Sequence, residues 1–337
     1  MPSSEINLGG ARSSSAIENT PLVKVFDNYT HYYAAGESHT ARAKRLDIQC
    51  FIKFLCSYRG CSKPEKLKIR DWDFSSVQRF IDECLAEGQA PATVTRRLAT
   101  LKHMGRTLAD KVAGFVNPAR EVKSPKVPAG KPKALTKQEL RMVRSRARER
   151  RKKKQSFIRI RNATIFEFLV DTGIRADEVR MLKRSQVDDK LEWVKSVRTK
   201  GRRFRNVYIT TALRPRLREY LEAREKELKR YFAKLNKPKD GSLPFFISNY
   251  GCKPDKPESF MMGAKTIWRA INELSADTKL HPHLLRHSYA LDLLKDSGDI
   301  RLVSQALGHS DVKITMRYTE RKDEEVARAL EKARRRG

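Results

Sequence analysis

The sequence predicts a mainly α-helical chain with one small β-sheet, an α+β fold arranged in two domains. Three observations lead to this prediction. Helical hydrophobic patterns recur along residues 22–116, a proline-rich segment follows at 117–133, and residues 134–337 combine further helical patterns with one alternating hairpin. A length of 337 residues also suits two ordinary domains.

The first domain is predicted over residues 22–116, after a polar leader over residues 1–21 that we expect to be poorly ordered. Its first apolar stripe follows Ser38, a suitable N-cap, and its second stops before Gly88, which suits a helix C-cap. A third helix opens after Pro91. The residues expected to face the core are Leu46, Phe51, Phe54 and Leu55, then Val77, Phe80, Ile81, Cys84 and Leu85, then Val94, Leu98 and Leu101.

The second domain is predicted over residues 134–337, after a linker over 117–133 that holds four prolines. A capping-box pattern at Thr136–Glu139 opens its first helix, which runs into a strongly basic stretch at 141–161. Next come a buried helix ending at Gly173 and a hairpin around Thr199–Gly201. Further helices are expected at about 212–235, 259–275, 283–296 and 300–307.

The charge balance favours a polyanionic partner. Lysine and arginine total 72 against 40 acidic residues, a formal net charge of +32, and each neutralised phosphate would release condensed counterions. A ribosomal or chromatin-like protein would share this charge. No apolar run approaches the ~18 residues that span a bilayer, and the start lacks the layout of a signal peptide. The five cysteines are odd in number and form no CxxC pair, which predicts reduced thiols in a cytoplasmic protein and argues against a disulfide framework and against a zinc finger.

Four of the seven histidines cluster near the C-terminus. His283 and His287 have the spacing of two metal ligands on one helix, but no HExxH glutamate accompanies them and Arg286 would repel a cation, so we expect no metal. His283 and Arg286 are three residues apart and share a helix face, where an imidazole beside a guanidinium suits a phosphate. His281 is expected at the surface and His287 in a packing role.

Two other groups could act with these histidines. Tyr318 lies nine residues after His309 in a polar stretch, and a phenol with a pKa near ~10 becomes a useful nucleophile when cations and a base assist its deprotonation. Arg175 and Glu178 lie one helical turn apart, just after Gly173. By themselves they could be a simple helix ion pair.

Four segments in this order carry a resemblance to a known family. TGIRADEV, the TKG turn, HPHLLRHSYA and LGHSDVKITMRY resemble the boxes of the tyrosine recombinases, the integrase family, from about residue 136 to the end. Residues 22–115 are similar to the family's helical core-binding domain. The resemblance implies a C-shaped clamp that closes around double-stranded DNA, and an enzyme without a cofactor. About twenty residues precede the first domain, too few for a separate arm-binding fold, which favours a simpler recombinase of the Cre, Xer or transposon type over a lambda-like integrase.

The resemblance also implies how the strand would be cut. Arg175 and Arg286 would hold the non-bridging oxygens of the scissile phosphate, where negative charge builds up. Lys200, in the hairpin turn, would protonate the departing 5′ oxygen. Attack by Tyr318 would give a 3′-phosphotyrosine, which conserves the bond energy and makes metal and ATP unnecessary.

The remaining matches have supporting roles. His283 would assist deprotonation of the tyrosine, and His309 would hydrogen-bond the phosphate. Glu178 would orient the site by holding Arg175 or His283.

The first domain's third helix would approach the major groove, and the basic stretch would contact the DNA backbone without reading sequence. The residues expected to contact DNA are Arg96, Arg97, Lys102, Arg150, Arg151, Lys152, Lys153, Lys154, Arg202 and Arg203. Residues 322–337 carry the apolar stripe of a short amphipathic helix, which would dock either on its own domain or on a neighbouring protomer of a tetramer assembled on paired sites.

Other functions remain open at this point. A type IB topoisomerase would use the same covalent chemistry as a monomer on many sequences, and a telomere resolvase is a third enzymatic possibility. A DNA-binding protein with decayed chemistry, such as a regulator, would keep the basic surface. The complete set of matching residues argues against decay. The target sequence and the choice among integration, excision and resolution do not follow from the sequence.

Overall fold

The computed structural model describes residues 17–127, 134–153, 156–199, 203–233, 240–275, 280–309 and 313–316, with the backbone only at 151–153 and 313–314. The chain divides into two compact units, Met1–Ala129 and Gly130–Gly337, which we describe separately as unit 1 and unit 2. The division falls inside the range predicted for the linker. The clamp that the two units would form stays a prediction.

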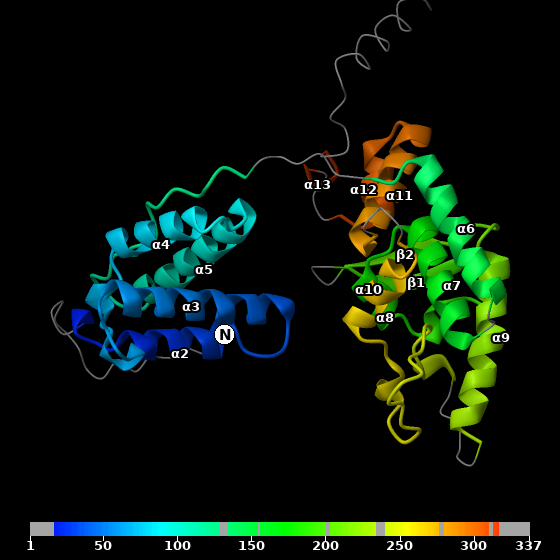
Figure 1. Cartoon of the computed structure of the whole chain (residues 1–337), viewed down its shortest axis with the longest axis horizontal. Coiled ribbons are helices and arrows are strands. Elements are labelled where there is room, and N and C mark those ends of the chain that lie inside the picture. The colour runs from blue at the N-terminus through cyan, green and yellow to red at the C-terminus, as the bar shows by residue number, and fades with distance from the viewer. Residues whose placement is uncertain are drawn as a thin grey trace, which may run out of the picture. The chain divides into compact units, whose positions relative to one another are not determined.

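Unit 1 is helical (Figure 1). Its long helices are α2 (Leu22–Tyr33), α3 (His39–Tyr58), α4 (Phe74–Ala86) and α5 (Pro91–Ala109), with short 3₁₀ turns at Pro64–Lys66 and Ile69–Asp71. The predicted start signals act as expected, since the Ser38 hydroxyl accepts a hydrogen bond from the Ala41 N–H at 3.1 Å and Pro91 occupies the first turn of α5. Aromatic and aliphatic side chains from all four helices form one core.

The predicted stripe on α3 is partly wrong. Leu46 is 55% exposed, whereas Ile48, Phe51 and Leu55 are buried at helical spacing. A buried carboxylate, Asp47, occupies the inward face beside Ile48. On α4, Leu85 at the last turn is also exposed, because it lies at the edge of the packed face.

The segments expected as leader and linker are partly packed on unit 1. Ile17 lies against the core, and Ala119 and Val122 are completely buried in it. The Asn117 side chain donates to the Lys102 carbonyl at 3.0 Å, which fixes this segment to α5. Residues 117–127 therefore belong to the compact unit, because their apolar side chains are buried despite the neighbouring prolines.

Unit 2 is built around α7 (Phe157–Thr172), which packs against four other helices (Figure 1). These are α6 (Lys137–Lys153), α9 (Arg214–Tyr231), α10 (Ala264–Asn272) and α11 (Pro282–Ser297). The short helices α8 (Ala176–Met181), α12 (Ile300–Leu307) and α13 (Lys313–Met316) complete the described part of the unit. Three of the predicted helices, α9, α11 and α12, lie close to their expected ranges, and a 3₁₀ turn at Pro257–Phe260 takes the place of the start expected for α10.

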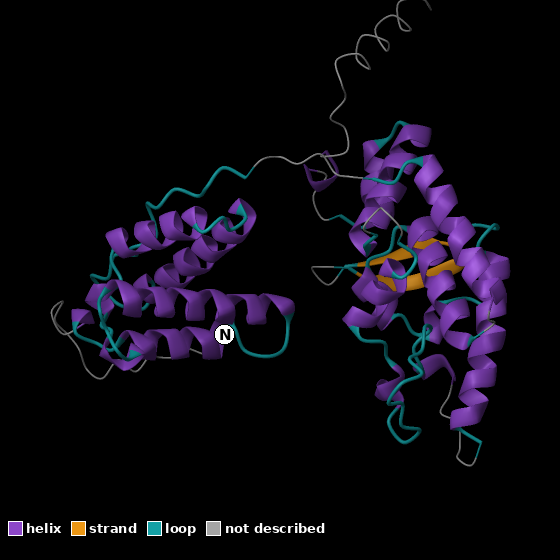
Figure 2. Cartoon of the chain, viewed as in Figure 1, coloured by secondary structure: helices purple, strands orange, loops and turns teal. Residues whose placement is uncertain are grey.

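One antiparallel sheet lies among these helices (Figure 2). In the described residues it has two strands, β1 (Trp193–Arg198) and β2 (Phe204–Tyr208), which pair Val194 with Val207 and Val197 with Arg205 across an irregular step. The inward residues of β1 and β2 reach the core of unit 2. The predicted fold class, mainly α with a small sheet, is confirmed. Of the helices that the structure describes, none has the length and apolar character needed to cross a membrane.

Candidate active site

A glycine turn positions the first predicted arginine. Helix α7 ends at Gly173, whose φ of 60° is left-handed, and a Cβ there would lie 2.3 Å from the Tyr289 ring. The turn makes Arg175 the N-cap of α8. Glu178 then accepts the Arg175 backbone N–H and its Nη1, both at 2.9 Å. The TGIRADE motif thus begins helix α8, and the Glu178 carboxylate within the motif fixes the Arg175 side chain.

Glu178 has a second cationic partner that the sequence analysis missed. Arg205 of β2 donates Nη1 to Oε1 at 3.2 Å and Nη2 to Oε2 at 2.9 Å, a two-pronged pair whose side chains are 8% and 6% exposed. Burial would raise the pKa of Glu178, but hydrogen bonds and charge from Arg205, followed by those from Arg175, lower it. Glu178 is therefore ionised at neutral pH and holds two arginines.

The second predicted arginine lies at the centre of the site. Arg286 of α11 is 5% exposed. Its Nη1 donates to the Gly173 carbonyl at 2.6 Å and its Nη2 to the Leu307 carbonyl at 2.7 Å. One buried guanidinium thus joins the segment before Arg175 to the segment before His309.

His283 lies in the first turn of α11, among positive charges. The helix start is fixed by Pro282 and by His281, whose Nδ1 accepts the Leu284 N–H at 3.1 Å, a capping role that the sequence analysis did not anticipate. Partial burial, and next the charges of His281, Arg286 and Arg175, lower the pKa of His283. The imidazole is therefore neutral near pH 7 and can accept a proton.

His309 follows the left-handed turn at Gly308, where α12 ends. Its Nδ1 lies 2.8 Å from the Oγ1 of Thr315, a buried residue of α13. A Cβ at Gly308 would lie 2.9 Å from both Arg205 Nη1 and Thr199 Cγ2. The turn therefore brings His309 close to the base of the hairpin and to the Arg205–Glu178 pair.

The structure thus pairs Arg175 with Glu178, and Arg286 contacts the backbone of the segments that precede Arg175 and His309. The charges of Arg175 and Arg286 also act on His283. Lys200, Arg202, Lys154, Tyr318 and the C-terminal stripe lie outside the described residues, as do the side chains at 151–153. His287 is half-buried and has a partner. Among the described residues no three His, Cys, Asp or Glu side chains gather as a metal site would require.

Two of the cations predicted to contact DNA are already engaged within unit 1. Arg96 donates to the buried Asp47 carboxylate at 2.6 Å, and Arg97 donates to the Cys84 sulfur at 3.2 Å. In unit 2, Arg150 donates to the Glu273 carbonyl.

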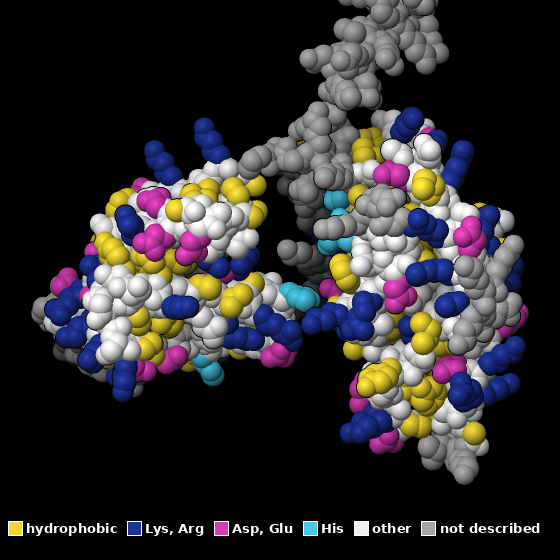
Figure 3. Space-filling view, viewed as in Figure 1, with side chains coloured by type: hydrophobic (Ala, Val, Ile, Leu, Met, Phe, Trp, Pro, Cys, Tyr) yellow, Lys and Arg dark blue, Asp and Glu magenta, His cyan; other side chains and the backbone are white. Residues whose placement is uncertain are grey.

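Lys102 is half-buried and Arg203 is exposed. Lysine and arginine side chains outnumber acidic ones on the visible face of each unit, and a group of histidines lies on that of unit 2 (Figure 3).

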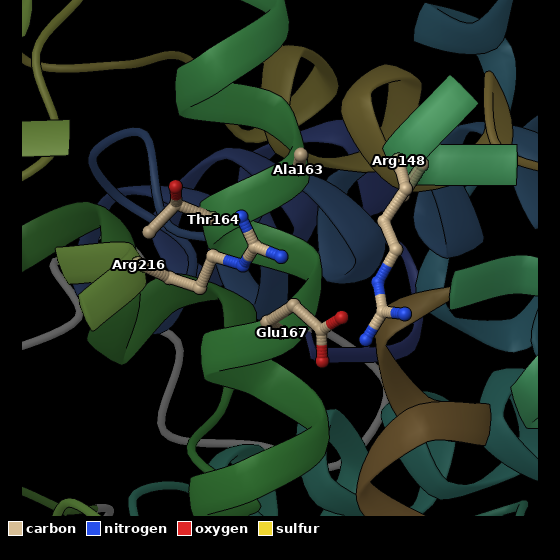
Figure 4. Close-up of a pocket in the computed structure, with 6 residues that line it drawn as sticks. Arg148, Ala163, Thr164, Glu167 and Arg216 are labelled. Carbon is tan, nitrogen blue, oxygen red and sulfur yellow. The ribbon is translucent and has the colours of Figure 1, made fainter. Parts of the chain in front are cut away.

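A separate polar pocket lies between α6, α7 and α9 (Figure 4). Glu167 of α7 lies there between Arg148 and Arg216, and Arg144 donates to its Oε2 at 3.0 Å. None of the residues that line this pocket belongs to the predicted catalytic set.

The helical fold with its small sheet, and the way Arg286 joins the segments before Arg175 and His309, are what we expect of a tyrosine recombinase, the class of enzymes that break and rejoin DNA strands. The sequence pattern of the phage integrase family matches residues 133–325, more than half of the chain, and the chain belongs to that family.

Curated relatives agree with this assignment, and solved structures share the fold. The chain is 28% identical over 295 residues to the tyrosine recombinase XerC of Thermodesulfovibrio yellowstonii, covering 87% of this chain and 89% of the relative. It is 29% identical over 261 residues to XerA of Thermococcus onnurineus, covering 77% and 81%.

The fold is similar to that of XerH bound to a palindromic difH substrate, with a TM-score of 0.65, 18% identity and coverage of 94% and 84% of the two chains. It is also similar to the Tn1549 transposon integrase in complex with transposon right end DNA, with a TM-score of 0.64, 15% identity and coverage of 93% and 99%.

Proposed function

We propose that this protein is a site-specific DNA recombinase that cuts and rejoins strands through a 3′-phosphotyrosine intermediate, without metal or ATP. The observation that carries the proposal is the position of Arg286. Its two carbonyl contacts place the Arg175 and His309 segments on either side of one buried guanidinium. This arrangement suits an anion with several oxygens, such as a DNA phosphate.

The proposed reaction is a transesterification that balances without a further reactant. The Tyr318 oxygen attacks phosphorus, and its proton passes to the neutral imidazole of His283. The bond from phosphorus to the 5′ oxygen breaks, and Lys200 gives that oxygen a proton. Arg175 and Arg286 stabilise the charge that develops on the non-bridging oxygens. Attack by a 5′-hydroxyl from another strand reverses these steps and rejoins the DNA.

The proposed partners are double-stranded DNA with a specific recombination site and further copies of this chain, as a tetramer on paired sites. XerH and the Tn1549 integrase were solved with recombination-site and transposon DNA, which supports a DNA substrate. The reaction would serve integration, excision or resolution of DNA elements. A chromosomal substrate would place the enzyme in the cytoplasm, at the nucleoid.

The first experiment tests the covalent step. Nicked suicide duplexes are made from DNA that flanks the gene, incubated with the protein in EDTA, and resolved on SDS gels. We expect a protein–DNA adduct from the wild type and none from Tyr318→Phe, because removal of the phenol oxygen removes the nucleophile. An equal adduct from Tyr318→Phe would contradict the proposal. Relaxation of supercoiled plasmids that lack the site, without exchange between paired sites, would instead identify a topoisomerase.

A further inference from the structure

We propose that Arg205 is a positioning residue for the phosphate clamp and acts through Glu178 on Arg175. This inference rests on the proposed function and adds to it a residue outside the set that the sequence boxes predicted. Arg205 lies on β2, 27 residues beyond Glu178, and its side chain is nearly buried. It would touch no reacting atom.

Two arginines share the Glu178 carboxylate unequally. Arg205 occupies both oxygens with its two Nη groups, whereas the Arg175 side chain reaches Oε1 through Nη1. The Arg175 side chain remains 31% exposed. Without Arg205, both oxygens of a buried carboxylate would turn to Arg175. The fuller ion pair would then draw that guanidinium away from a phosphate.

The Arg205 side chain also lies close to the turn at Gly308. Its Nη1 and Cδ lie within 3.0 Å of the point where a Cβ at Gly308 would stand, and the methyl group of Thr199 lies equally close. Thr199 is the residue before Lys200, and its backbone N–H donates to the Arg203 carbonyl at 2.7 Å. Arg205 is therefore wedged between the Glu178 carboxylate and the turn that carries His309, so a shorter side chain would leave Glu178 without its fixed partner.

A lysine cannot replace this arginine. The planar guanidinium makes two parallel hydrogen bonds to one carboxylate, whereas an ammonium group is a compact charge without that fork. Arg205→Lys thus keeps the positive charge and removes the paired hydrogen bonds to the Glu178 carboxylate. Arg224→Lys is a matched control, because Arg224 is equally buried in unit 2 and pairs with Asp240 at 2.7 Å, outside the predicted site.

The experiment measures adduct formation on suicide DNA and, separately, equilibrium DNA binding and thermal unfolding. We expect Arg205→Lys to slow adduct formation by about 10²-fold, the size expected when a catalytic group is displaced. DNA binding should change less than about threefold, and Arg224→Lys should form adduct at the wild-type rate. The effects of Glu178→Gln and Arg205→Lys should not add in the double variant, because both act on Arg175 through the Glu178 carboxylate.

Two modified substrates show which catalytic group is affected. A neutral methylphosphonate at the scissile position leaves less charge for Arg175 to stabilise, so the Arg205→Lys defect should shrink on it. A 5′-bridging sulfur leaves without protonation and should not reduce the defect. A defect that shrinks on the 5′-bridging sulfur and not on the methylphosphonate would show that Arg205 acts on the proton donor to the 5′ oxygen. That result would overturn the inference.

An undiminished rate in Arg205→Lys, or an equal loss in Arg224→Lys, would also overturn it. If the wild-type chain forms no Tyr318-dependent adduct, the proposed function fails and the inference fails with it.

Discussion

At the scale of single residues, Glu178 is a buried carboxylate that pairs with two arginines. Its folded pKa lies below the ordinary value of 4.5, because its hydrogen bonds with Arg205 and Arg175 outweigh the effect of burial. A carboxyl group whose pKa falls on folding stabilises the protein above its unfolded pKa. That stabilisation is lost as the pH falls through the lower, folded value.

The lowered pKa of Glu178 predicts how the stability of unit 2 depends on pH. We expect Glu178→Gln to lower the free energy of unfolding of unit 2 by about 2–3 kcal/mol at pH 7, because a buried charged acceptor of two arginines is removed. The difference between variant and wild type should narrow below pH 4.5 as the wild-type carboxylate is protonated. Urea titrations at pH 7, 5 and 3 measure it. A difference that stays constant down to pH 3 would show that the charge of Glu178 is not what stabilises the unit.

The sequence boxes singled out Arg175, Glu178, Arg286 and His309. In the structure Arg175 pairs with Glu178, and Arg286 contacts the backbone of the segments before Arg175 and His309. Arg205 was missed because it lies in the run RRFR, where every cation has the same composition signal. A usable signal was the alternation of β2. Val207 and Ile209 are buried, and Arg205 lies two residues before Val207. Alternate residues of a strand point to the same face, so Arg205 points to the core side.

At the scale of helices, a polar contact fixes α3 against α5. The carboxylate of Asp47 is 1% exposed and accepts hydrogen bonds from Arg96 at 2.6 Å and from Thr100 at 2.9 Å. Hydrophobic periodicity could not predict this contact, because a period of 3.6 residues marks an inward position without naming an aspartate as its occupant. The same limitation explains why Leu46 was placed inward.

We expect Asp47→Ala to destabilise unit 1 by about 2 kcal/mol, since Thr100 loses a buried acceptor and Arg96 loses its ion pair. Part of the Arg96 side chain is exposed, so solvent screens some of that pairing. Glu37→Ala is the control. Its pair with Arg42 is exposed on both sides, and its loss should cost less than about 0.5 kcal/mol. Equal losses in the two variants, measured by chemical denaturation, would contradict the assignment.

At the scale of the whole molecule, the charge of +32 predicts DNA binding that weakens steeply with salt. Replacing residues 150–154 by glutamine should weaken binding equally on all sequences. It should also reduce the slope of log affinity against log salt by about 0.9 for each phosphate that the protein no longer neutralises. Titrations at several salt concentrations measure both quantities. Arg150→Lys with Arg151→Lys keeps the charge and should keep the slope, and a weakening confined to one target sequence would contradict the prediction.

Composition did not show which residues of the predicted linker pack on unit 1. The division into two units lies between Ala129 and Gly130, within the proline-rich range. Ala119 and Val122 nevertheless pack on unit 1, because a few apolar residues can anchor a segment that its prolines mark as irregular. Composition averages over such residues, and the tertiary contacts that bury them leave no local pattern.

The position of Arg286 has one more consequence. Its two acceptors, the carbonyls of Gly173 and Leu307, lie at the C-terminal ends of α7 and α12, where backbone carbonyls lack helical partners and the helix dipole is negative. One side chain therefore caps two helices at once. These two carbonyl contacts hold the guanidinium in place through the partial charges of two helix ends. Arg286 thus joins two helix ends of unit 2, and under the proposed function the same side chain would also bind the scissile phosphate.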